Sequence, residues 1–416
     1  MNNFKKELHN EAHAHTAADR SISRSINREV LLDIIRKSNG IFKAALAKQL
    51  GLTKPAVARV VADLINMGLV EEQGYGNSGK NGGGRPMMLH FNDKFKYIGA
   101  LDLSLHEPAC AIGTMSHHTI GLKKIKISKY ASVEDKREHI TEAFSSIMQE
   151  NSISKNELGC IVISHPGIIG ADGEPAYTVE QFRAWTQIDI KYHLEKEFDI
   201  PIVLENDVRC AAIGEMQVGL QGKLSNLLYV SCGMGLASSI IINGKLYEGI
   251  NRASGEMGST LDGEGRRRED TVAMNGLIEH LQRLLASAGR KEELDFSKIV
   301  ELAAEGDAII NWGIRDIGRD IGRIIYNTAV ILDIPTIIFG GDYLKLGQSI
   351  FDGMEDAIPQ THYLPRPQIV KSTVMESAGI FGGFVLGTNI IIRQTLADFS
   401  VMRNGANCSL DNAAAK

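Results

Sequence analysis

Residues 200–219 read IPIVLENDVRCAAIGEMQVG. The apolar run at its start predicts a buried strand, and the segment from Val208 onward has the helical spacing of apolar residues. Asp207 lies at the junction and opens the helix, where backbone N–H groups and the helix dipole favour a charged carboxylate. Because ligands of α/β proteins bind at the carboxyl ends of strands, Asp207 and its neighbour Asn206 are candidate ligand contacts.

The segments on both sides of this unit follow one pattern. Before it come three predicted antiparallel strands, a helix and a buried strand, at residues 97–104, 108–115, 119–127, 133–150 and 158–164. After it, a second set of strands begins at residues 226–233 and 236–249. An order of strands and helices that starts again in this way predicts two α/β lobes around a cleft.

A segment rich in Lys and Arg precedes the lobes. Residues 25–40 have the apolar spacing of an amphipathic helix, and residues 43–70 follow as KAALAKQLGLTKPAVARVVADLINMGLV. In this segment Gly51 can take a tight turn, Thr53 can cap a second helix, and Pro55 fits the first turn of that helix. Two short helices joined in this way are typical of the helix-turn-helix, whose second helix enters the DNA major groove.

The second helix carries the candidate DNA contacts Thr53, Lys54, Ala56 and Arg59, which we expect to be exposed. Small residues let a helix approach base edges, Arg can bind guanine, and Lys can bind a phosphate. Residues 69–92 predict two strands with a long tip, a wing, from which Arg85 can enter the minor groove. The alternatives are a basic three-helix bundle that only packs on its neighbour, and a flexible linker that contains Arg85 by chance.

The composition is that of a soluble globular protein with two or three domains. The chain has 416 residues, of which 44% are hydrophobic and 23% are charged. Its five cysteines lie far apart without a CxxC pair, which favours buried thiols in a reducing compartment. The N-terminal residues lack the apolar core of a signal peptide, and no stretch approaches the pattern of a membrane span. We therefore expect a cytoplasmic protein without membrane insertion.

The chain resembles the ROK family, which groups sugar kinases with sugar-responsive repressors. The motifs that carry the resemblance are residues 51–70 with GGRP, HPGIIGADG, IPIVLENDVRCAAIGE, VSCGMGLASSIIINGKLYEGINRASGEMG, TIIFGGDYL and SAGIFGGFVLG. The resemblance implies an α/β fold with an N-terminal winged helix-turn-helix followed by an actin-like (ribonuclease H-like) two-lobe ROK domain. The DNA-binding extension indicates the regulator branch, since the kinases of the family generally begin at the first strand.

The resemblance also implies domain boundaries and ligand contacts. The domains would be a disordered tail (1–20), the winged helix-turn-helix (21–91), lobe 1 (92–212, completed by a C-terminal helix at about 372–400), lobe 2 (213–371) and a tail (401–416). In the kinases the aspartate that matches Asp207 takes a proton from a sugar hydroxyl, and Asn206 suits a vicinal diol. Glu256 and Glu269 match two further sugar-binding glutamates. These four residues are the predicted effector contacts, and none is predicted to be catalytic.

Two features of the family are changed in this chain. The kinases have an Asp-x-Gly-Gly-Thr turn for the nucleotide phosphates, whereas residues 101–108 read LDLSLHEP and fill the turn with side chains. In most relatives GEMG is followed by a zinc-binding His and a Cys-containing loop, whereas here Ser259 precedes a loop without Cys at residues 261–270. The sequence therefore predicts no kinase activity, no metal and no cofactor, and it predicts that the arginines of this loop pair with its carboxylates.

These observations predict a transcriptional regulator, a repressor of carbohydrate-metabolism genes that is controlled by a sugar or sugar derivative in the cleft. The expected partners are operator DNA, a small carbohydrate and further copies of the chain, as a homodimer or higher homo-oligomer. Two alternatives stay open. One is an ATP-dependent sugar kinase with an appended DNA-binding domain, and the other is a regulator signalled by a partner protein, with a vestigial sugar site.

Overall fold

The computed structural model describes residues 27–75, 87–104, 107–128, 130–178, 182–360 and 366–413, and the side chains of its last helix up to residue 401. The predicted tail at 1–20 and the predicted DNA contact Arg85 lie outside the described residues. The chain forms two compact units. The first unit holds the described residues up to Tyr97, the turn Thr114–His118 and the chain from Gly387 onward, and the second unit holds Ile98–Gly113 and Thr119–Leu386.

The first unit contains short helices and a two-stranded hairpin. Residues 27–37 are helical, and helices α2 (Lys43–Leu50) and α3 (Lys54–Asn66) follow. Strands β1 (Val70–Tyr75) and β2 (Met87–Phe91) pair antiparallel, as the alternating pattern of residues 69–92 predicts. The helices share a small apolar core that includes Leu31, Ile35, Leu46, Val57 and Leu64.

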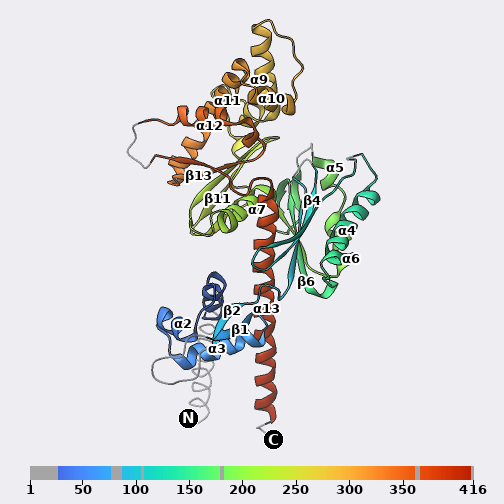
Figure 1. Cartoon of the computed structure of the whole chain (residues 1–416), viewed down its shortest axis with the longest axis vertical. Coiled ribbons are helices and arrows are strands. Elements are labelled where there is room, and N and C mark those ends of the chain that lie inside the picture. The colour runs from blue at the N-terminus through green and yellow to red at the C-terminus, as the bar shows by residue number, and fades with distance from the viewer. Residues whose placement is uncertain are drawn as a thin grey trace, which may run out of the picture. The chain divides into compact units, whose positions relative to one another are not determined.

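Two five-stranded sheets form the centre of the second unit (Figure 1). The strands of one sheet are β3 (Tyr97–Asp102), β4 (Ala109–Thr114), β5 (Thr119–Lys124), β6 (Leu158–His165) and β9 (Ile202–Asn206). Those of the other are β10 (Leu227–Cys232), β11 (Leu236–Ile242), β12 (Lys245–Tyr247), β13 (Thr336–Gly340) and β14 (Gln368–Lys371). The strand orders are β5-β4-β3-β6-β9 and β12-β11-β10-β13-β14, so the two sheets have the same topology. In each sheet the strands at the start of this order pair antiparallel, and those at its end pair parallel. The predicted pair of α/β lobes is confirmed.

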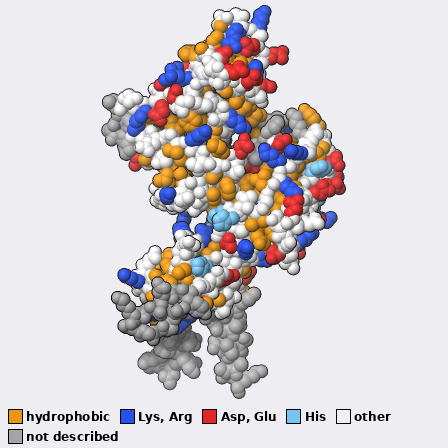
Figure 2. All heavy atoms as spheres, in the orientation of Figure 1, with side chains coloured by type: hydrophobic (Ala, Val, Ile, Leu, Met, Phe, Trp, Pro, Cys, Tyr) orange, Lys and Arg blue, Asp and Glu red, His pale blue; other side chains and the backbone are white. Residues whose placement is uncertain are grey.

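Helices pack against each sheet. Lobe 1 carries α4 (Val133–Glu150), α5 (Arg183–Thr186) and α6 (Ile190–Phe198), with the turn η1 (Lys155–Glu157) and the small hairpin β7 (Gly167–Ile169) and β8 (Pro175–Thr178). Helix α7 (Asp207–Gly214) follows β9 of lobe 1, but Val208 and Ala212 pack against strands of the lobe 2 sheet. Lobe 2 carries η4 (Met257–Ser259), α8 (Arg268–Val272), α9 (Met274–Ser287), α10 (Phe296–Ala304), α11 (Ala308–Leu332), η5 (Asp342–Leu346) and α12 (Gln348–Ala357). One apolar cluster joins its sheet to these helices. Basic and acidic side chains are interspersed over this lobe on the face shown in Figure 2, and ion pairs such as Arg315–Asp356 link them.

Two helices of the second unit cross at very close range. Helix α7 continues as a single π-helical turn, η3 (Glu215–Gly219), and the turn η6 (Met375–Ser377) leads into α13 (Ala378–Ala413). A Cβ atom added to Gly382 would lie 1.9 Å from the carbonyl oxygen of Cys210, and one added to Gly214 would lie 2.3 Å from that of Ala378. The two backbones therefore touch through glycines, and a side chain at either position would force them apart.

Helix α13 corrects one expectation from the sequence. Residues 375–401 are long and apolar enough to span a membrane by length and composition, although the sequence pattern was expected to contain no such stretch. In the structure 56% of the most apolar part of this segment is buried. Burial of this kind is typical of a core helix in a globular protein, because a helix that is apolar on most sides needs protein neighbours in water.

Glu215 fixes the chain segment that leads into α13. Its carboxylate is completely buried and accepts hydrogen bonds from the hydroxyl groups of Ser372 at 2.7 Å and Thr373 at 2.6 Å. It also accepts hydrogen bonds from the backbone N–H groups of Thr373 and Val374. A buried carboxylate is tolerated only with such a full set of donors, so this contact joins the π-helical turn after α7 to the residues before α13.

We expect Glu215→Gln to lower the free energy of unfolding by about 2–3 kcal/mol, because the amide nitrogen would face hydrogen-bond donors. Urea denaturation followed by circular dichroism measures this change. The matched control is Glu150→Gln, since Glu150 is exposed and accepts hydrogen bonds from Lys123 and Ser146 at the surface. The control should change the unfolding curve little, and equal effects of the two substitutions would contradict the role given to Glu215.

Candidate functional sites

Helices α2 and α3 are joined by a tight turn that the local sequence determines. Gly51 ends α2 in the left-handed conformation with φ of 63°, which glycine adopts without strain. Thr53 caps α3, and its hydroxyl accepts a hydrogen bond from the backbone N–H of Ala56 at 3.4 Å. Pro55 lies in the first turn of α3, as predicted. Helix α3 buries Val57, Val60, Val61 and Leu64, so its opposite side faces solvent.

The outer face of α3 carries most of the predicted DNA contacts. Thr53, Lys54 and Arg59 are exposed. Ala56, which was predicted to be exposed, is half-buried because it lies beside the apolar face of the helix. Small exposed residues occur instead at Ala58 and Ala62, four and eight positions after Lys54. Their spacing from Lys54 is the signal in the sequence that could have identified them.

The carboxyl end of β9 carries the first of the predicted effector contacts. Asn206 caps α7, since its side-chain oxygen accepts a hydrogen bond from the N–H of Arg209 at 3.0 Å. Its amide nitrogen donates to the carbonyl oxygen of Gly167 at 2.9 Å and to the carboxylate of Asp207 at 3.0 Å. Asn206 was predicted to offer a donor and an acceptor to a diol, but in the ligand-free protein it uses both within the chain.

Asp207 differs from the prediction in its charge. Burial, with smaller contributions from the nearby carboxylates of Asp102 and Glu256, raises the pKa of Asp207 to about 7, against backbone N–H donors that lower it. The sequence predicted a charged carboxylate stabilised by the start of α7. That helix has only eight residues, and the cost of removing the charge from water outweighs its effect.

Asp102 lies at the end of β3, close to Asp207. It is buried, and burial raises its pKa, while hydrogen bonds from Ser104 lower it. The backbone N–H and the hydroxyl of Ser104 both donate to the same Asp102 oxygen, at 3.0 and 2.6 Å. Ser104, in the turn after β3, therefore folds back on Asp102, whereas residues 105 and 106 of this turn lie outside the described residues.

Glu256 and Glu269 belong to lobe 2 and complete the carboxyl cluster, defined as Asp102, Asp207, Glu256 and Glu269. Glu256 retains contact with solvent, but crowding by the surrounding protein, together with the charge of Glu269, raises its pKa. Glu269 is half-buried, which raises its pKa. A Cβ atom added to Gly235 would lie 3.2 Å from the Glu269 carboxylate, so this glycine makes room for it. The structure thus brings all four predicted contacts together with Asp102, because Asn206 is hydrogen-bonded to Asp207.

An ion-pair network beside this cluster was not predicted. The guanidinium of Arg209 is buried, lies 3.4 Å from the carboxylate of Glu205, and donates to the carbonyl oxygen of Arg252 at 2.6 Å. Arg252 in turn donates to Glu205 at 2.8 Å and pairs with Glu248 at 3.0 Å. The network ties β9 and α7 of lobe 1 to the segment that precedes Glu256. Only the spacing of Glu205 and Arg209, four residues apart on either side of a helix start, hinted at it.

The loop at residues 261–270 is held by ion pairs between its own residues. Asp262 accepts hydrogen bonds from the backbone N–H of Glu264 and Arg266, and it pairs with the Arg266 guanidinium at 2.9 Å. Arg267 pairs with Asp270 at 2.8 Å. The predicted pairing of arginines with carboxylates is confirmed. Within the described part of the chain, no group of three His, Cys, Asp or Glu side chains is placed to hold a metal ion.

The glycines shared with the nucleotide loops of kinases have structural roles here. A Cβ atom added to Gly233 would lie 2.8 Å from the Asp342 carboxylate, and one added to Gly341 would lie 2.4 Å from the carbonyl oxygen of Cys232. Gly341 also has a φ of 86°, which favours glycine. The close packing of the segments that contain Gly233 and Gly341 therefore explains why both positions are glycine.

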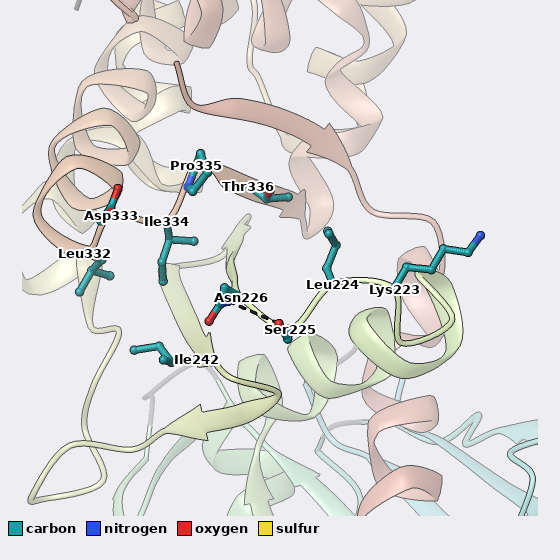
Figure 3. A pocket seen from close by; sticks show the side chains of 10 residues that line it. All are labelled: Lys223, Leu224, Ser225, Asn226, Ile242, Leu332, Asp333, Ile334, Pro335 and Thr336. Atoms are coloured by element: carbon teal, nitrogen blue, oxygen red, sulfur yellow. Dashed lines mark hydrogen bonds between the residues drawn. The ribbon is translucent and has the colours of Figure 1, made fainter. Parts of the chain in front are cut away.

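A hollow of about 470 Å³ lies at the other end of the lobe 2 sheet (Figure 3). Asn226 and Thr336, which line it, stand at the amino ends of the parallel strands β10 and β13. Ligands of α/β sheets bind at the carboxyl ends of the strands. We therefore do not assign this hollow to the effector.

Comparison with known proteins agrees with this architecture. The ROK family model matches residues 99–389, more than two thirds of the chain. The xylose repressor of Bacillus spizizenii is 30% identical over 367 residues, covering 85% of this chain and 91% of that protein. The glucokinase of Halalkalibacterium halodurans is 27% identical over 268 residues, covering 59% of this chain and 81% of that protein.

A similar fold occurs in a crystal structure of a ROK family transcriptional regulator, a homologue of the E. coli Mlc protein. Its TM-score is 0.72 at 19% sequence identity, and the match covers 91% of this chain and 99% of that chain. The similar fold and the extent of the family match agree. The chain belongs to the ROK family.

Proposed function

We propose that this chain is a DNA-binding transcriptional regulator that represses genes of carbohydrate metabolism in response to a sugar or sugar derivative. The observation that carries the proposal is the presence, in one chain, of an exposed, N-capped helix with basic residues and a carboxyl cluster at the strand ends of a two-lobe fold. Similarity to a xylose repressor over 85% of the chain supports it. Such a protein acts in the cytoplasm, where the DNA is.

The DNA-binding domain in this proposal is residues 21–91. Lys54 and Arg59 are exposed on α3, and the small residues Ala58 and Ala62 allow the helix to approach base edges. Arg85, outside the described residues, remains a predicted minor-groove contact. We propose a homodimer or higher homo-oligomer, because two copies of α3 on two half-sites double the phosphate and base contacts.

The effector in this proposal binds at the carboxyl cluster, between residues of lobe 1 (92–212) and lobe 2 (213–371). Carboxylate oxygens accept hydrogen bonds from sugar hydroxyls, and a carboxyl group that holds a proton can also donate one. The cluster takes two members from each lobe, so a ligand bound there would contact both. A ligand alters DNA binding only if it prefers one arrangement of the protein over another, and a site shared by two lobes provides that preference.

The rival proposal is a sugar kinase with an appended DNA-binding domain, which the similarity to a glucokinase favours. Phosphoryl transfer requires backbone N–H groups that are free to bind the nucleotide phosphates. Here the N–H of Ser104 is bonded to Asp102, and Glu107 brings a negative charge close behind it in the chain. A second rival is a regulator whose signal is a partner protein.

We expect no transfer of phosphate from Mg·ATP to hexoses or pentoses, because the N–H of Ser104 is already bonded to Asp102 and the sequence of the turn lacks the glycines of the kinases. A coupled assay for ADP formation with D-xylose, D-glucose and N-acetylated hexosamines measures this. Robust turnover that Asp207→Asn abolishes would establish the kinase instead. Absence of sugar binding in calorimetry, combined with specific DNA binding, would favour the regulator that responds to a partner protein.

We expect Arg59→Ala to weaken binding to the preferred DNA duplex by about 1–3 kcal/mol and to relax its sequence preference, because Arg59 is placed to contact a base. The duplex can be selected in vitro from random sequences with the wild-type protein and used in fluorescence anisotropy. Arg323→Ala is the matched control, since Arg323 is exposed on α11 in the second unit. Equal binding by wild type and Arg59→Ala would show that α3 does not read the sequence.

We expect sugar affinity to rise between pH 6 and pH 8, by up to about tenfold, as Asp207 ionises. Its pKa of about 7 means that the carboxyl group is mostly protonated at pH 6, and the ionised form is the stronger hydrogen-bond acceptor. Calorimetry at both pH values tests this. Asp207→Asn should bind more weakly and with a flatter pH profile, whereas the exposed control Asp172→Asn should keep the wild-type profile. If sugar affinity depended on pH in Asp207→Asn as it does in wild type, Asp207 would not be a sugar contact.

A further inference from the structure

His165 is a buried polar side chain without a hydrogen-bond partner. Only 2% of the residue is exposed, and neither ring nitrogen has a partner in the ligand-free protein. Buried polar groups in folded proteins are nearly always hydrogen-bonded, so an imidazole with two unpaired nitrogens requires an explanation. One explanation is a ligand that supplies the missing partner.

The position of His165 in the sheet is that of a ligand contact. His165 ends β6, which lies between β3, ending at Asp102, and β9, ending at Asn206. In the parallel pairing of β6 and β9, His165 is directly opposite Asn206, so the two side chains start from the same face of the sheet. The N–H of Leu103 bonds to the carbonyl oxygen of Ser164, which brings the end of β3 to the same edge.

The chemistry of His165 complements that of its neighbours. Burial lowers the pKa of the imidazole to about 4, so the ring is neutral at physiological pH and offers one N–H donor and one nitrogen acceptor. Asn206 has committed its side-chain oxygen to Arg209 and its amide nitrogen to Gly167 and Asp207. The carboxyl cluster consists of acids alone. A sugar hydroxyl both donates and accepts hydrogen bonds, and the neutral imidazole of His165 can form either kind of bond with it.

We infer that His165 is a specificity-determining contact of the effector site, and that it hydrogen-bonds a hydroxyl group of the sugar beside Asp207. This inference rests on the proposed function and extends it to a residue outside the predicted contacts.

The test is calorimetric titration of wild type and His165→Leu with D-xylose and D-glucose. The substitution replaces the imidazole with an apolar side chain of similar size and removes both nitrogens, so affinity for the bound sugar should fall by about tenfold or more. The Tm of the sugar-free protein should stay the same or rise, because a buried unpaired polar group has been removed. His165→Asn, which retains a donor and an acceptor, should recover part of the affinity and guards against misfolding of the first variant.

His193→Leu is the matched control. His193 lies on α6 in the same lobe, and its ring already has a partner in the Thr141 hydroxyl at 3.1 Å. The control should bind sugar like wild type. Wild-type affinity in His165→Leu, together with loss of affinity in Asp207→Asn, would overturn the role of His165 alone. Failure of the wild-type protein to bind either sugar or any other in a carbohydrate panel would overturn the proposed function and this inference with it.

Discussion

Contact between the backbones of α7 and α13 determines the geometry of the candidate effector site. A Cβ atom added to Gly382 would overlap the carbonyl group of Cys210, and one added to Gly379 would lie 2.1 Å from the Asp102 carboxylate. The two glycines let α13 lie directly behind the ends of the lobe 1 strands and keep water away from them. Glu215 then fixes the segment that enters α13 through its hydrogen bonds to Ser372 and Thr373.

Burial at this crossing gives the carboxyl cluster its chemical character. In water four neighbouring carboxylates would all be ionised, whereas here burial comes first among the causes that raise the pKa of each one. Carboxyl groups whose pKa is shifted by burial and by neighbouring charges are often found in functional sites. The adjacent network of Glu205, Arg209 and Arg252 supplies positive charge without entering the cluster itself. The carboxyl cluster therefore suits a neutral ligand rich in hydroxyl groups better than a triphosphate, whose negative charge it would repel.

Features set by local sequence could be predicted, and those set by distant contacts could not. The cap at Thr53 and the helix at residues 133–150 follow from capping chemistry and apolar spacing, and both are present. The raised pKa of Asp207 could not be predicted, because it depends first on how deeply the fold buries the carboxyl group and then on Asp102, more than a hundred residues away in the chain. His165 carried no signal in the sequence, since its lack of partners is a property of the folded sheet. The exposure of Ala56 was predicted wrongly because the boundary of an apolar helix face depends on what packs against it.

In the function proposed for this chain, sugar binding and DNA binding are linked. The most direct measurement is the affinity for an in vitro selected DNA duplex with and without a saturating sugar, together with the affinity for that sugar with and without the duplex. We expect the sugar to change the DNA affinity by about 5- to 150-fold. The duplex should change the sugar affinity by the same factor, because coupling between two binding sites is reciprocal. A sugar that binds tightly and leaves the DNA affinity unchanged would contradict the proposed linkage.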